Sequence, residues 1–313
     1  MKKVILFIAA AFLCIGSAQA QDEAIFGHYL VNPMLINPAY AGFNSATQIN
    51  GHLRSQWSGF DNAPKTYAAT ISLPMTEKVG IGAMLLTEKF GAQDRLRAQL
   101  NYAYRYEHKR YKWAIGFSTE FHRYRLAASV NDPNTPLIDN NDILVMDRIK
   151  GLTIFDASFG GVAEIDDKFL LSLSSPNLIR AIVGDTDAAS RQKTFFRQVI
   201  LMAGYRIRKT SVTFEPSIQI RKVFQAPFEV DMNMKAMAFD NKLVAGITVR
   251  PGNSGNIGLL MGTKQPGFQI YYSYNSSLAQ YNSYSRNGHE VTVGVEIAKK
   301  ENKIERGNKR YRN

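Results

Sequence analysis

The chain has 313 residues, a formal net charge of +12, 11% aromatic residues and one cysteine. One cysteine excludes an internal disulfide, and after residue 20 no apolar stretch approaches the roughly 18 residues of a transmembrane helix. A basic chain can bind nucleic acid, acidic proteins or anionic lipid, and its compartment decides among these partners.

Residues 1–20 have the pattern of a secretory signal peptide. A basic start and an apolar run at 4–15 are followed by the small-x-small sequence Ala-Gln-Ala at 18–20, which predicts cleavage at that point. Cys14 suggests a lipoprotein site, but the preceding Leu13 is not the small residue that such a site requires. Export of a basic chain favours anionic lipid, peptidoglycan-linked partners or an acidic protein, and we expect no nucleic-acid partner.

Residues 21–45 lie between the signal peptide and the first regular segment. They contain two Asn-Pro steps, Asn32-Pro33 and Asn37-Pro38. Proline lacks a backbone donor and restricts the residue before it. We therefore predict an irregular but ordered N-terminal arm here rather than a strand.

Segments with a period of two dominate the rest of the chain. In residues 95–106, apolar positions such as Leu96 and Leu100 alternate with polar positions such as Arg97, which gives a strand one apolar and one polar face. Many segments run for about ten residues or more, longer than strands of soluble sheets and suited to tilted membrane strands. We predict strands at 47–57, 66–74, 79–89, 95–106, 111–123, 152–164, 168–174, 195–208, 210–221, 227–239, 242–250, 256–263, 267–275 and 288–298.

These segments predict an all-β fold, a transmembrane antiparallel β-barrel of about 14 strands over residues 46–298. We expect the arm at 21–45 to enter the lumen, and residues 299–313 to form a basic periplasmic tail. The predicted location is the outer membrane, in contact with its lipid.

The connections between the predicted strands alternate in length. Short polar turns join some strands, as at 107–110 and 166–167, whereas long connections fall at 58–65, 125–151, 175–194 and 276–287. In outer-membrane barrels, short turns face the periplasm and long loops face outside. We call these ends the turn rim and the loop rim, and we expect both termini, with the arm, at the turn rim.

Two of the long connections carry apolar side chains in otherwise polar sequence. Exposed apolar anchors are costly without a partner, so we regard them as candidate partner-binding positions; a lid folded into the barrel mouth is the alternative. They are Leu137, Ile138, Ile143, Leu144, Val145, Leu178 and Ile179.

The residue pattern predicts neither an enzyme nor a metal or cofactor site. None of the histidines has a metal-type spacing, and we expect His52 and His122 to be solvated in the lumen or at the rim. Ser118 and His122 lie four residues apart on one strand face, about 13 Å along the strand, too far to form a catalytic pair. The adjacent Asp166 and Asp167 fall in a predicted turn.

Glycines and aromatic residues have structural interpretations. Glycines inside strand patterns indicate bends or close approach to an inner plug; they are Gly80, Gly82, Gly116, Gly160 and Gly161. Aromatic residues flank the turn at 107–110 and indicate an interfacial girdle, with a base-stacking or sugar-binding platform as the alternative. They are Tyr102, Tyr104, Tyr106, Tyr111 and Trp113.

Residues 29–42, YLVNPMLINPAYAG, resemble the segment that opens the PorP/SprF family of type IX secretion and gliding proteins. Asn37 and Pro38 suit a rigid turn, Tyr40 an anchor in the lumen, and Gly42 a sharp exit. The residues that carry the motif are Asn32, Pro33, Asn37, Pro38, Ala39, Tyr40 and Gly42.

The resemblance implies a non-enzymatic outer-membrane barrel that helps to secrete and anchor an adhesin-like surface protein. It further implies recognition of that protein's C-terminal sorting domain and contact with peptidoglycan-associated periplasmic components. The alternative function is a porin-like channel for small solutes. The polar lumen phase suits either function; it includes Gln48, Asn50, Arg54, Arg95, Arg97 and Arg105.

Overall fold

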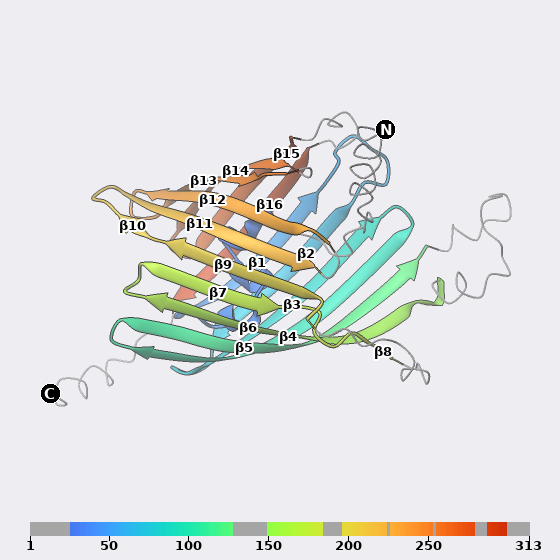
Figure 1. Cartoon of the computed structure of the whole chain (residues 1–313), viewed down its shortest axis with the longest axis horizontal. Helices are drawn as coiled ribbons and strands as arrows, with labels where there is room; N and C mark the ends of the chain where they lie inside the picture. The colour runs from blue at the N-terminus through green and yellow to red at the C-terminus, as the bar shows by residue number, and fades with distance from the viewer. Residues whose placement is uncertain are drawn as a thin grey trace, which may run out of the picture.

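The computed structural model describes residues 26–127, 149–183, 196–223, 226–252, 255–278 and 287–298. Its strands form one antiparallel sheet in which β16 pairs with β1, so that the sheet closes into the expected 14-strand barrel (Figure 1). The strands are β1 (Ala46–Ser55), β2 (Lys65–Pro74), β3 (Val79–Phe90), β4 (Gln93–His108), β5 (Tyr111–Leu126), β6 (Leu152–Ile165), β7 (Phe169–Ser175), β8 (Ala181–Ile182), β9 (Gln198–Tyr205), β10 (Ile207–Arg208), β11 (Val212–Val223), β12 (Phe228–Ala238), β13 (Leu243–Arg250), β14 (Asn256–Gln265), β15 (Phe268–Ser277) and β16 (Gly288–Ala298).

Two short strands explain why sixteen labels make fourteen barrel strands. β9 and β10 are parts of one strand, because both follow the same register against β11: Gly204 lies opposite Ser217, and Ile207 lies opposite Phe214. The interruption falls opposite Pro216, which has no backbone N–H to donate. β8 is a two-residue strand that pairs only with β6, away from the main strand order.

The alternation predicted from the sequence separates an apolar outer face from a polar inner face. On β4, Leu100 and Tyr102 are exposed on the outside, whereas Gln99 and Asn101 are buried in the lumen. The predicted girdle residues Tyr102, Tyr104, Tyr106 and Tyr111 are all exposed. Within the described ranges, no helix is long and apolar enough to cross a membrane.

The two rims differ as the connection lengths predicted. Tight turns at one rim use residues in the left-handed region, including Lys109, Asp166 and Asp167. The last strand ends at this turn rim, where Ala298 lies opposite Ala46. The strand ends that flank the long connections, Leu126 of β5, Leu152 of β6 and Gln198 of β9, lie at the opposite rim.

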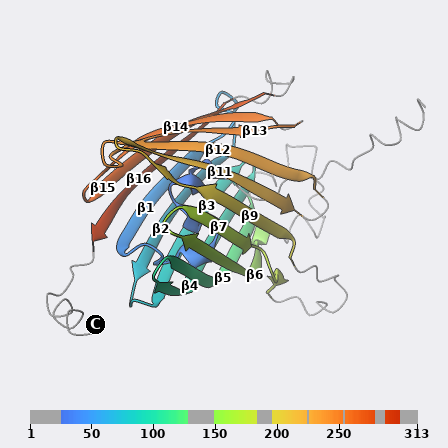
Figure 2. The ribbon, with the colours of Figure 1, turned by 60° about the vertical axis from the view of Figure 1, so that its left-hand side comes forward.

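The arm lies inside the barrel as three 3-10 turns, η1 (Gly27–Leu30), η2 (Pro33–Leu35) and η3 (Pro38–Tyr40) (Figure 2). The expectation that the whole arm lies at the turn rim is wrong. Gly27 contacts Glu290 near the loop-rim end of β16, and the arm then crosses the lumen to Gly42, beside the turn-rim ends of β2 and β3. Proline and a polar wall predict an arm in the lumen, but they do not predict its direction.

The outward position of Leu100 gives a direct test of the lipid-facing wall. Leu100 is 64% exposed and lies six residues along β4 from Tyr106, roughly 15 Å above it for a strand tilted by about 40°. We expect Leu100→Arg to lower the free energy of unfolding in lipid vesicles by about 2–4 kcal/mol, as measured by denaturant titration, and Leu100→Ala to cost less. A change within about 0.5 kcal/mol, as at an exposed site in a soluble sheet, would contradict a lipid-facing wall.

Candidate functional site

The start of the arm is anchored by the last strand of the barrel. The Glu290 carboxylate accepts hydrogen bonds from the backbone N–H groups of Gly27 (2.8 Å) and His28 (3.0 Å). The His28 ring bonds through Nδ1 to the Thr292 hydroxyl at 2.6 Å, and all three side chains are buried. A buried carboxylate on two backbone donors is a strong, directed contact, so β16 fixes where the arm begins.

A second network ties η2 to the neighbouring strands. The Asn32 amide lies 2.9 Å from both His52 Nε2 and the Thr70 hydroxyl, and His52 Nδ1 lies 2.7 Å from Thr292 Oγ1. The expectation that His52 and His122 are solvated is wrong, because they are only 3% and 2% exposed. The arm and the packed lumen side chains cover positions that an open barrel would leave in water.

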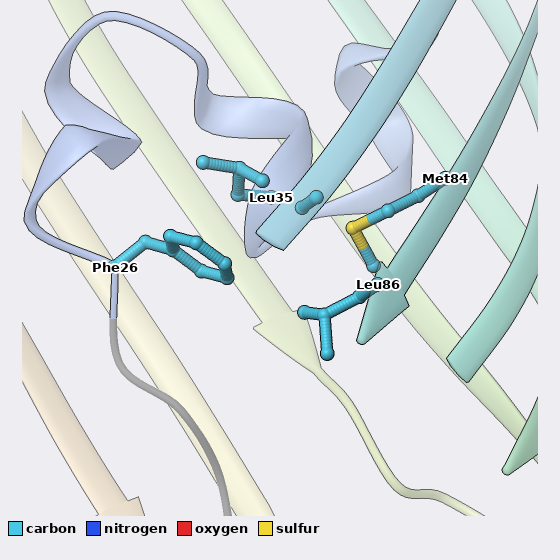
Figure 3. Packing of buried hydrophobic residues seen from close by; sticks show 5 residues of the cluster. Phe26, Leu35, Met84 and Leu86 are labelled. Atoms are coloured by element: carbon cyan, nitrogen blue, oxygen red, sulfur yellow. The ribbon is translucent and has the colours of Figure 1, made fainter. Parts of the chain in front are cut away.

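Apolar side chains of the arm pack on the inner face of β3. Phe26 and Leu35 meet Met84 and Leu86 in a buried cluster (Figure 3). Inward apolar residues are unusual for a polar lumen, and burying side chains of this size contributes about 1.5–3 kcal/mol each. The contact therefore indicates a seated plug rather than a loosely tethered segment.

Asn37 is the most highly connected motif residue. Its Oδ1 accepts a bond from the backbone N–H of Ala39 at 2.9 Å, which caps η3. Its Nδ2 lies within hydrogen-bond distance of the Ser172 hydroxyl (2.9 Å) and the carbonyls of Gly161 (3.1 Å) and Leu173 (3.2 Å). One amide thus shapes the turn before Pro38 and joins it to β6 and β7.

Strand glycines allow the arm to lie directly on the wall, through its backbone at Ala39 and Ala41 and through side chains at Met34 and Asn37. A Cβ at Gly82 would lie 2.6 Å from the Met34 sulfur, and a Cβ at Gly80, Gly116 or Gly160 would overlap with Ala41, Ala39 and Asn37 respectively. These four glycines make the close approach to an inner plug that the sequence predicted. Gly161 differs: a Cβ there would meet only the Ala114 carbonyl, at 3.8 Å.

The arm leaves the lumen through a guanidinium clamp. Gly42 adopts a φ of 61°, which glycine tolerates without strain. Arg105 donates from Nη1 to the Gly42 carbonyl (2.5 Å), from Nη2 to the Thr76 carbonyl (2.7 Å) and from Nε to the Glu77 carbonyl (2.9 Å). Arg105 thus joins the exit of the arm to the β2–β3 turn. Tyr40 packs edge-on against Phe43 beside this exit.

A cavity of about 700 Å³ remains between the arm and the loop rim. Its floor is the start of the arm, and its aromatic wall includes Trp57 and Phe90, whose rings meet edge-on at 5.5 Å. Arg54 also lines it, and its Nη1 is buried without a hydrogen-bond partner among the described residues. The charged lining residues are Arg54, Glu88, Arg95, Asp231 and Arg250. This combination suits a ligand with hydrogen-bond acceptors and an apolar part.

A smaller cavity of about 190 Å³ lies beside the arm at the turn rim. Arg206 bridges Glu164 (2.9 Å) and Glu215 (2.5 Å), and Lys235 lies 2.5 Å from Glu215. Lys235 also donates to the Leu30 carbonyl at 3.2 Å. The cluster links the middle of the arm to four strands and leaves little space there.

The lumen wall holds a buried serine, histidine and glutamate, the residue types of a catalytic triad, but their contacts differ from those of a triad. Glu120 lies between Ser118 (2.7 Å) and His122 (3.2 Å), and it also contacts Arg97 at 2.8 Å. Serine activation needs a base in contact with the hydroxyl, whereas here both groups bond to the carboxylate. In the described part of the chain, no three His, Cys, Asp or Glu side chains gather as a metal site.

Of the seven apolar loop residues predicted to bind a partner, the structure describes only two. Leu137, Ile138, Ile143, Leu144 and Val145 lie outside the described residues. Ile179 is 40% exposed, and Leu178 is half-buried. Their segment is fixed to β6, because Leu178 N–H donates to the Ala157 carbonyl and Ile179 N–H donates to Asp156 Oδ1. Arg54 was predicted from the sequence only as one of the polar lumen residues. Glu290 was missed, because its only signal in the sequence is a polar position on a strand.

Comparisons with known proteins concern both family and fold. A family model described as type IX secretion system membrane protein PorP/SprF matches residues 18–295, and no curated protein matches the chain in sequence. The CymD monoaromatic hydrocarbon channel is similar with a TM-score of 0.56 at 10% identity, covering 91% of this chain and 96% of that one. The TodX deltaS2S3 mutant, also a monoaromatic hydrocarbon channel, has a TM-score of 0.53 at 10% identity, covering 88% and 95%. At such identity the likeness shows the fold alone.

The neighbouring glycines of β6 provide a matched test of the arm contact. We expect Gly160→Val to lower the free energy of unfolding by about 1–3 kcal/mol, because its side chain would displace Asn37. Gly161→Val should change it far less, because that position has open space and valine suits a strand. Denaturant titration of both variants in lipid vesicles measures the difference. Equal losses would show that the arm does not rest on this wall.

Proposed function

The chain belongs to the PorP/SprF family of type IX secretion system membrane proteins, and from this premise we propose that it is a plugged, non-enzymatic barrel that helps to secrete and anchor a surface protein. The cargo is an adhesin-like protein, held through its C-terminal sorting domain. The barrel supplies a fixed receptor in the outer membrane rather than a solute path.

The observation that carries this proposal is the arm seated across the lumen. It is anchored at Glu290, packed on strand glycines in the middle and clamped by Arg105 at its exit. The start of the arm forms the floor of a cavity at the loop rim, and such a concave site favours docking of a ligand or partner. A plug fixed at three levels obstructs the lumen, which disfavours free diffusion of solutes through the barrel.

The two rims would have different partners. At the loop rim, the cavity and exposed apolar residues such as Ile179 favour contact with the cargo. At the turn rim, residues 299–313 contain seven Lys and Arg against two Glu, which favours a charge-dependent contact with peptidoglycan-associated periplasmic components. This contact should weaken with salt.

A porin-like channel is the second candidate function. The polar lumen wall favours it, since Gln99, Asn101 and many similar side chains face inward. The seated arm opposes it.

Filling the loop-rim cavity tests the docking site. Asn256 lines the cavity at the loop-rim end of β14, and Gln265 lies at the other end of the same strand. We expect Asn256→Trp to weaken capture of the surface protein roughly tenfold or more, equivalent to about 1.4 kcal/mol, because the indole would occupy cavity space. The measurement is the amount of surface protein that co-purifies with the barrel from outer membranes.

Gln265→Trp is the matched control and should leave capture unchanged. Both variants must show the heat-dependent gel mobility of a folded barrel. Undiminished capture by Asn256→Trp would place the cargo contact elsewhere.

A further inference from the structure

Four exposed cations gather on the outer wall at the loop rim: Lys65 of β2, Lys89 of β3, and Arg123 and Arg125 of β5. The strand registers place Lys65 opposite Lys89, Lys89 opposite Asp94, and Asp94 opposite Arg125. Lys65, Lys89, Asp94 and Arg125 therefore form one row across neighbouring strands. Arg123 lies two residues closer to the membrane centre on β5. The group holds four positive charges and one negative charge.

The two arginines continue the lipid-facing side of β5. Along this strand, Phe121, Arg123 and Arg125 are exposed, whereas His122 and Tyr124 between them are buried in the lumen. Because side chains alternate in a strand, Arg123 and Arg125 share the outer face with Phe121. Their guanidinium groups point toward the bilayer side of the wall and away from the cargo cavity.

Their height along the strand matches the boundary of the apolar layer. Arg123 lies ten residues along β5 from Trp113, which is part of the girdle at the turn rim. Ten residues rise roughly 33 Å along a strand, or about 25 Å along the barrel axis at a tilt of about 40°. The apolar band of such barrels is about 25 Å tall, so Arg123 reaches the headgroup level of the opposite leaflet.

The cation group is confined to one side of the barrel. On the far wall, the outward positions near the loop rim are apolar at Phe228, Val249 and Ile257. Two cations lie at this rim outside the group: Lys222, which contacts the Phe228 ring and donates to the Ala226 carbonyl, and the exposed Arg197 directly before β9. A general attraction to any anionic membrane would not require this asymmetry.

We propose that Lys65, Lys89, Arg123 and Arg125 bind the phosphate groups of a phosphorylated glycolipid in the outer leaflet. Guanidinium groups bind phosphate through paired, charge-assisted hydrogen bonds, and basic groups at headgroup level select anionic lipids. A protein partner fits less well, because this face looks into the bilayer. The bound glycolipid would fix the rotation of the barrel in the membrane on its β2–β5 side.

Binding of lipid A tests the proposal. The purified barrel in neutral detergent micelles would be titrated with fluorescent lipid A, and an Arg123→Gln/Arg125→Gln double variant would be titrated in parallel. We expect the double variant to bind at least tenfold more weakly. Lipid A stripped of its phosphates should bind the unmodified barrel as weakly, and raising the salt concentration should weaken the phosphorylated form.

The matched control is Lys209→Gln/Lys242→Gln, which removes two exposed cations at the turn rim. It should bind lipid A as the unmodified barrel does, and every variant must keep its heat-dependent gel mobility. Equal binding by the Arg123/Arg125 variant would overturn the site. Phosphatidylglycerol bound as tightly as lipid A would overturn the choice of ligand, because that lipid represents a general anionic surface.

Discussion

Contact between the arm and the glycines of the barrel wall is the constraint on which the rest of the structure depends. A closed barrel in lipid satisfies its own backbone groups, but it leaves a wide lumen lined by polar side chains. Here the arm covers that lining, and it approaches so closely that a methyl group at Gly116 or Gly160 would overlap with it. Burial of His52 follows from the same seating, because Asn32 of the arm contacts its ring, and the start of the arm forms the floor of the loop-rim cavity.

The same seating connects the two rims. Glu290 holds the arm near the loop rim, and Arg105 holds it at the turn rim, so one continuous segment touches both the proposed cargo cavity and the periplasmic end. The outer wall has a separate role. Its apolar band meets lipid, and the cations above that band on β2, β3 and β5 give one side of the barrel a distinct chemistry.

Much of this architecture was predictable from alternation and composition. The period of two in segments such as 95–106 predicted the strands and their faces, and the Asn-Pro steps predicted an irregular arm. The strand glycines predicted either bends or close approach to an inner plug, and four of the five make that approach. The direction of the arm was not predictable, because it depends on long-range bonds such as Glu290 to Gly27. Burial of His52 was missed for a related reason. The sequence pattern of a polar inward position is identical whether water or a plug covers the side chain.

Ion conductance in planar bilayers tests the central claim most directly. With the arm seated, the intact barrel should show no large steady conductance, and a variant lacking residues 21–42 should open a stable pore, provided that its heat-dependent gel mobility confirms a folded barrel. A large steady conductance from the intact protein would contradict the account. It would mean that the arm does not close the lumen and that the barrel serves as a channel.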